Sequence, residues 1–147
     1  MKYIFLFLVL VLFSCDKNED GTTEESPISY SFFIAGHTYG SPGVDNDGLH
    51  PAFKNKFDLI QSDGHIGFGV LTGDIVITGT EQNWNEVDND IIDLGLPVYF
   101  AAGNHDMTDR VLFESRYGQT YYSFVHQSDL FIVLYPNLDE WNISDDQ

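Results

Sequence analysis

The stretch Phe100-Ala101-Ala102-Gly103-Asn104-His105-Asp106 decides how this chain is expected to fold. It is one of three segments with the same order of residues: an apolar run, a small residue, a glycine and then a polar side chain. The other two are Phe33-Ile34-Ala35-Gly36-His37 and Val70-Leu71-Thr72-Gly73-Asp74. Glycine at the end of a strand admits backbone conformations that other residues avoid, and it leaves room for the next side chain to lean over the strand end. The repeated pattern therefore predicts three strand ends that present polar groups.

Between these strand ends the sequence alternates between strand and helix patterns. The predicted strands are 28–35, 66–71 and 97–101, and the predicted helices are 51–64, 81–94 and 108–117. The helices are recognised by apolar residues at spacings of three and four, and the strands by short β-prone runs next to glycine or proline. Alternation of this kind predicts an α/β fold, in which right-handed crossovers build a parallel sheet with flanking helices.

Two further local patterns complete the predicted fold. After Gly118, residues 121–125 and 130–135 predict an antiparallel hairpin whose turn is 126–129. Within the predicted 81–94 helix, Asp88, Asp90 and Asp93 are expected on the outer, hydrated face, because the apolar residues of that helix take the inner one.

The three polar strand ends are candidates for a common site. In open α/β sheets ligands bind at the carboxyl ends of the strands, so neighbouring strands would bring His37, Asp74 and the 104–106 segment together. In that segment Asn104 offers a neutral oxygen ligand, His105 a proton carrier and Asp106 an orienting acid. A single glycine-aspartate pair is more often a turn than a site, but the threefold repetition favours a site.

These residues resemble the motifs of the calcineurin-like metallophosphoesterase family. Gly73-Asp74 resembles the second family motif and Gly103-Asn104-His105-Asp106 the third, and the resemblance covers residues 28 to 147. It implies hydrolysis of a phosphate mono- or diester. It also implies that Asp74 bridges two metal ions, that Asn104 binds one of them, and that His105, with Asp106, has a catalytic role in contacting the phosphate and assisting the leaving group. The mixed oxygen and nitrogen donors suit manganese, iron or zinc.

The first family motif, Asp-x-His, is altered in this chain. His37-Thr38-Tyr39 stands in its place, so His37 and Tyr39 are the expected metal ligands there. A remodelled site and a degenerate site are equally consistent with this change, and a loop tyrosine more often packs or stacks than ligates. The later family motifs, a lone His and Gly-His-x-His, have no counterpart after Asp106. The chain is therefore expected to be the N-terminal part of a longer protein, and to turn over little substrate by itself.

Composition limits the classes of function, and the N-terminal segment predicts how the chain is divided. Six Lys and Arg against 23 Asp and Glu give a net charge of −17, which disfavours nucleic-acid binding. An apolar fraction of 43% is enough for a globular core. Residues 1–14 are expected to be a signal peptide, 15–27 an acidic linker and 28–147 the domain.

The residues before Cys15, Leu12-Phe13-Ser14, resemble a bacterial lipobox. The resemblance implies a lipid on Cys15 that anchors an exported protein to the bacterial outer membrane or cell surface, so that the lipid is the only contact with the membrane. The alternative is a free cysteine beside an ordinary cleavage site. The rival to an enzyme is a non-catalytic surface lipoprotein that keeps the fold as a binding module with a degenerate metal site.

Overall fold

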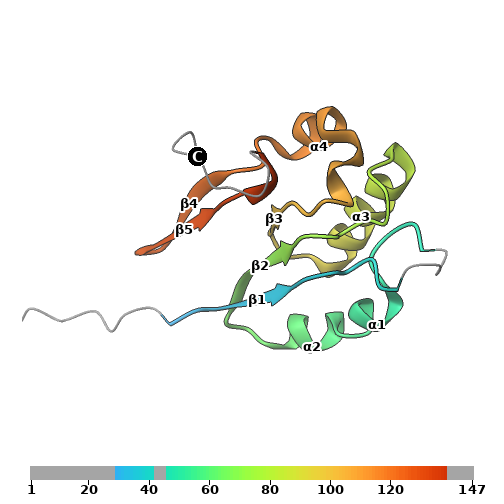
Figure 1. Cartoon of the computed structure of the whole chain (residues 1–147). Helices are drawn as coiled ribbons and strands as arrows, with labels where there is room; N and C mark the ends of the chain where they lie inside the picture. Colours follow the sequence, from blue (N-terminus) through green and yellow to red (C-terminus); the bar gives the residue numbers. More distant parts are fainter. Residues whose placement is uncertain (1–28, 42–45, 139–147) are drawn as a thin grey trace, which may run out of the picture.

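The computed structural model describes residues 29–41 and 46–138, so the predicted signal peptide, the linker and Cys15 lie outside the described residues (Figure 1). Its elements in chain order are β1 (Ser31–Ala35), α1 (Pro51–Lys54), α2 (Phe57–Ser62), β2 (Ile66–Thr72), α3 (Glu81–Leu94), β3 (Val98–Ala101), the 3-10 turn η1 (Asp106–Asp109), α4 (Arg110–Tyr117), β4 (Tyr122–His126), β5 (Asp129–Val133) and η2 (Pro136–Leu138). Over the described ranges, no helix combines the length and apolar character that crossing a bilayer would require.

The three predicted strands form one parallel sheet. Their order is β1-β2-β3, and the register pairs Ile34 with Val70 and Val70 with Tyr99. Because the strands are parallel and adjacent, their carboxyl ends lie side by side at one edge of the sheet. The predicted α/β class, a parallel sheet with flanking helices, is confirmed.

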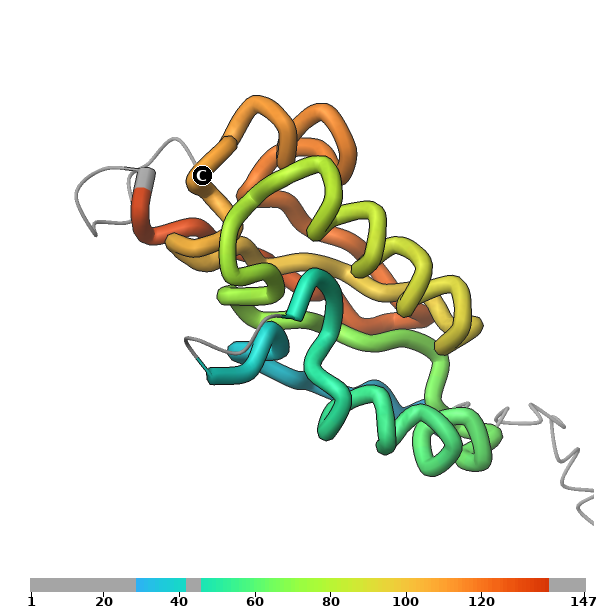
Figure 2. Tube along the Cα trace, turned by 90° about the vertical axis from the view of Figure 1, so that its right-hand side faces the viewer, coloured from blue at the N-terminus to red at the C-terminus, as the bar shows by residue number. Residues whose placement is uncertain are grey.

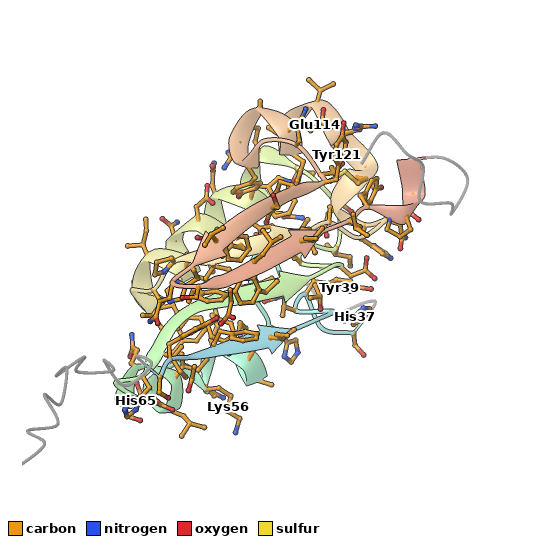
Figure 3. All side chains as sticks on the ribbon, turned by 90° about the vertical axis from the view of Figure 1, so that its left-hand side faces the viewer. His37, Tyr39, Lys56, His65, Glu114 and Tyr121 are labelled. Atoms are coloured by element: carbon orange, nitrogen blue, oxygen red, sulfur yellow. The ribbon has the colours of Figure 1, made fainter. Side chains whose placement is uncertain are left out.

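Helices and hairpin cover opposite faces of this sheet. Figure 2 shows α1, α2 and α3 in front of the sheet with the hairpin β4-β5 behind it, and Figure 3, from the other side, shows the hairpin in front. On the helix side, Leu71 packs into a core with Trp84, Val87 and Phe113, each 1% exposed or less. Burial of these large apolar side chains is the main force that holds the helices on the sheet.

An aromatic cluster holds the hairpin on the other face. Phe68 of β2 is 1% exposed, and its ring centroid lies 5.1 Å from Phe32 and 5.1 Å from Phe131. Next to it, Tyr99 stacks on Phe124 at 3.6 Å. Successive side chains along a strand point to opposite faces of the sheet. In β1, β2 and β3, one alternating set of side chains therefore faces the helices and the other set faces the hairpin.

Predicted and observed elements differ in detail at several places; the helix expected over 108–117, for instance, starts within the 3-10 turn η1 and is α-helical from Arg110. The helix expected over 51–64 is two short helices, because Lys56 N–H bonds back to Phe53 at 2.8 Å and this tight turn ends α1 before α2 begins. The hairpin turn is shorter than predicted, since His126 pairs with Asp129 and only two residues connect the strands. Gln127, at the start of that connection, has a φ of 53°, as a two-residue turn requires.

Helix α3 has the predicted bounds, but one predicted outer-face residue is wrong. Asp90 is buried at 8% exposure, and its carboxylate accepts hydrogen bonds from Leu49 N–H at 2.8 Å and from Lys54 Nζ at 3.0 Å. The loop before α1 lies over this part of the helix, with Gly48 against the Asp90 side chain. A helical pattern cannot predict this, because the loop comes from a distant part of the chain.

Candidate functional site

A cavity of about 370 Å³ opens at the carboxyl edge of the sheet. It is lined by His37, Thr72, Gly73, Asp74, Ala101, Ala102, Gly103, Asn104, Pro136 and Asn137. Figure 3 shows His37 and Tyr39 at the end of β1, while His65 lies at the opposite end of the sheet. The structure thus brings together residues from all three predicted strand ends.

Backbone hydrogen bonds continue beyond the strands and join these ends. His37 N–H donates to the Gly73 carbonyl at 2.9 Å, and Gly73 N–H donates to the Ala101 carbonyl at 2.6 Å. His37 and Asp74 then adopt left-handed conformations, with φ values of 56° and 52°. Non-glycine residues seldom do so, and such strain gathers at functional sites. For both strands the left-handed backbone conformation therefore occurs at the residue that carries the polar side chain, just after the strand ends.

The loops after β2 and β3 lie closer together than side chains would allow. A Cβ on Gly103 would lie 2.4 Å from the backbone nitrogen of Asp74 and 2.4 Å from its Oδ1. A Cβ on Gly73, whose φ is 76°, would lie 3.2 Å from Gly103 Cα. The two glycines therefore allow the Asp74 carboxylate to reach the start of the Asn104 segment.

Asp74 is the central polar group of the cavity. Its Oδ2 lies 3.3 Å from His37 Nδ1, and its Oδ1 accepts a hydrogen bond from His105 N–H at 3.4 Å. The Asp74 side chain is 23% exposed and that of His37 is 54% exposed, so both are open to a ligand. Asn104 is exposed beside them.

The donor set at the cavity fits a divalent cation in part. One imidazole, one carboxylate and one amide oxygen are donors that manganese, iron and zinc accept. Within the described ranges, no group of three or more His, Cys, Asp or Glu side chains could hold a metal ion. The donors that this edge of the sheet offers to a cation are therefore His37, Asp74 and Asn104.

His105 is oriented by a backbone carbonyl. Its Nδ1 lies 2.9 Å from the Ile77 oxygen, which can only accept, so Nδ1 carries the proton and donates. The nitrogen that remains for proton exchange is Nε2. The side chain is half-buried and belongs to the residue after Asn104, but it does not line the cavity in the described structure.

Tyr39, predicted as a metal ligand, lies inside the protein. It is 2% exposed, and its ring lies 4.5 Å from the His37 ring and 5.1 Å from the His105 ring, measured between centroids. Its position is that of a packing ring beside both imidazoles, which is the alternative considered from the sequence.

Asp106, predicted as part of the catalytic pair, has no exposed surface. Its Oδ1 accepts hydrogen bonds from Ile75 N–H at 2.8 Å and Val76 N–H at 3.0 Å, and its Oδ2 accepts one from Gly103 N–H at 2.7 Å. Burial raises the pKa of this carboxyl above its ordinary value, although the three N–H donors oppose the shift. The carboxylate touches backbone and not the cavity.

Two cavity residues were missed by sequence analysis. Pro136 and Asn137 line the cavity from η2, directly after the hairpin. Among the described residues, the Asn137 Oδ1 atom is buried without a hydrogen-bond partner. The sequence carried a weak signal, since Pro136-Asn137 also follows a predicted strand. That signal was not enough, because the sequence did not show where the hairpin lies relative to the carboxyl edge of the parallel sheet.

A comparison with protein-family models matches residues 34–145 to the calcineurin-like phosphoesterases, which is more than half of the chain. The chain belongs to the calcineurin-like phosphoesterase family. This agrees with the observed sheet and with the placement of the second and third motifs at neighbouring strand ends. Searches of curated proteins and of solved structures found no match. The family indicates a hydrolase of phosphoesters, of a kind that works with divalent metals.

Proposed function

We propose that this protein hydrolyses phosphate mono- or diesters with two divalent cations, manganese, iron or zinc, bound at the carboxyl edge of the sheet. The observation that carries the proposal is the cavity in which His37, Asp74 and Asn104 meet. Membership of the phosphoesterase family supports the same chemistry. The substrate is an anion, and in a chain of net charge −17 the cations would provide the local positive charge that attracts it.

Each polar residue has a distinct part in this proposal. Asp74 would bridge the two cations, His37 would bind one of them and Asn104 the other. When bound, a pair of cations polarises the phosphoryl group and makes an attacking water a stronger nucleophile. His105, held through Nδ1 by the Ile77 carbonyl, would contact the phosphate and protonate the leaving oxygen from Nε2. Because Nδ1 is the donor in the hydrogen bond to the Ile77 carbonyl, Nε2 is the nitrogen that can give or take a proton.

The test compares variants of the full-length gene product with matched controls. A chromogenic phosphate monoester and diester are assayed with each metal in turn. We expect Asp74→Asn to abolish metal-dependent turnover, and His105→Ala to lower it by about 10²–10⁴-fold. The control is His65→Ala, whose exposed imidazole lies at the other end of the sheet. Turnover that survives Asp74→Asn, or that falls equally in His65→Ala, contradicts the assignment.

The burial of Tyr39 favours a second candidate, a binding module that keeps the fold and has lost turnover. Where the family motif has a His, the described structure has a ring packed between His37 and His105. The two candidates differ in metal content. Wild-type protein that binds neither manganese, iron nor zinc, measured by calorimetry and elemental analysis, and that shows no turnover supports the binding module.

We also propose that the protein is exported and anchored by a lipid on Cys15, to the bacterial outer membrane or cell surface. The support is the sequence pattern around Cys15 and the acidic linker that follows it. Metabolic labelling with an alkyne fatty acid tests this. We expect the label and the membrane association of the wild type to disappear in Cys15→Ser. A wild-type protein without label contradicts the anchor and leaves the hydrolase proposal standing.

A further inference from the structure

We propose that Asp106 is a positioning residue that fixes the distance between two candidate metal ligands, Asp74 and Asn104. Its carboxylate makes three backbone hydrogen bonds, to the N–H groups of Ile75, Val76 and Gly103, and we call these three bonds the Asp106 clasp. This inference rests on the proposed function only where it treats Asp74 and Asn104 as metal ligands. The clasp itself lies in the described structure.

Each carboxylate oxygen serves a different loop. Oδ1 accepts from Ile75 and Val76, which follow Asp74 in the loop after β2. Oδ2 accepts from Gly103, which precedes Asn104 in the loop after β3. One rigid planar group therefore joins the residue next to one candidate ligand to the residue next to the other.

The position of Asp106 is itself fixed by its own turn. In η1, Thr108 Oγ1 accepts a hydrogen bond from Gly79 N–H at 2.6 Å, so this turn is attached to the loop after β2 at a second point. A Cβ on Gly79 would lie 2.7 Å from the Asp106 carbonyl oxygen, which shows how closely the two segments pack. Because Asp106 has no exposed surface, water cannot take over its hydrogen bonds.

This arrangement matches what a metal centre needs from its surroundings. Binding geometry must be held to within about 0.5 Å, and loops achieve this only when other groups lock them. Between β2 and β3 the backbone hydrogen bonds end with that from Gly73 N–H to the Ala101 carbonyl, before Asp74 and Asn104. The clasp continues that connection past both ligands, so it should act on metal affinity and not only on overall stability.

The test uses Asp106→Asn, because an amide keeps the size of the carboxylate but has only one acceptor oxygen. That oxygen can satisfy one loop, while the amide NH₂ faces the N–H donors of the other. We expect the oxygen to stay with Ile75 and Val76, where it accepts two bonds, and the Gly103 N–H, next to Asn104, to lose its acceptor. Amide hydrogen exchange in the metal-free full-length protein should then accelerate about tenfold or more at Gly103. The Kd for Mn²⁺ should rise by a similar factor.

The matched control is Asp90→Asn. Asp90 is also a buried carboxylate that accepts a backbone N–H, but it joins α3 to the loop before α1. We expect Asp90→Asn to lower thermal stability and leave the Mn²⁺ affinity unchanged. Equal loss of Mn²⁺ affinity in both variants overturns the positioning role, as does wild-type exchange at Gly103 in Asp106→Asn.

A measurement on the wild type covers the case in which Asp106→Asn does not fold. If one carboxylate holds both loops, the amides of Ile75, Val76 and Gly103 share one opening free energy in hydrogen exchange. Unrelated opening free energies at the two loops overturn the clasp. A wild-type protein that binds none of manganese, iron and zinc overturns the proposed function instead, and the exchange data still decide whether the clasp exists.

Discussion

The close approach of the loops after β2 and β3 predicts a large effect for Gly103→Ala. The added Cβ would lie 2.4 Å from two atoms of Asp74, its backbone nitrogen and Oδ1, and 3.0 Å from the Gly73 carbonyl carbon. Atoms in good contact are about 3.5–4.0 Å apart, so Asp74 must move by about 1 Å. The φ of Gly103 is not in the left-handed region, so the effect is steric and not conformational.

The expected cost of this overpacking is about 1–3 kcal/mol. For a domain of this size each kcal/mol lowers the Tm by about 4 °C, so calorimetry should record a fall of about 4–12 °C. Because the displaced group is the Asp74 carboxylate, the Kd for Mn²⁺ in isothermal titration should rise as well.

Gly64→Ala is the control for this prediction, since a Cβ there meets no atom within 4 Å. We expect it to keep the wild-type Tm and Mn²⁺ affinity. If Gly103→Ala matches Gly64→Ala in both measurements, the two loops are not in close contact and the added methyl group does not displace Asp74.

Three further predictions concern the rest of the fold. Phe68→Ala should cost about 3–5 kcal/mol in denaturant unfolding, because it removes the buried ring between sheet and hairpin; a cost under 1 kcal/mol would show that the aromatic cluster does not hold the hairpin. Thr80→Ala should cost about 0.5–2 kcal/mol, because Thr80 Oγ1 accepts the Asn83 N–H at the start of α3; equal stability of Thr80→Ala and wild type contradicts the cap. The hydrogen bond from Tyr30 to Asp129, at 2.6 Å, raises the pKa of Tyr30 to about 12. A raised pKa means that this contribution to stability is complete below the ordinary tyrosine pKa of about 10 and is lost as the pH rises through about 12. Absorbance titration at 295 nm should show Asp129→Asn returning the pKa toward 10, and an unchanged titration curve contradicts the hydrogen bond.

Local patterns in the sequence predicted much of the fold. Helix α3 begins and ends where the spacing of its apolar residues predicts, and the structure adds a Thr80 cap at its start and a left-handed Gly95 at its end. These signals lie within a few residues of one another, so they act before any tertiary contact forms. The repeated strand-glycine-polar pattern was equally local, and the rule that parallel strands end at one edge was enough to bring His37, Asp74 and Asn104 together.

What only the tertiary structure decided was the environment of each polar side chain. Asp90, Asp106 and Tyr39 are all polar residues whose types allow exposure, yet each is buried by a segment far away in the sequence. Asp106 is buried against the loop after β2, about thirty residues earlier, and the partners of its carboxylate are backbone N–H groups that carry no sequence signature. The motif therefore determined which side chains reach the edge of the sheet. Packing determined which of them face the cavity and which hold its walls, because burial depends on contacts between segments that no local pattern contains.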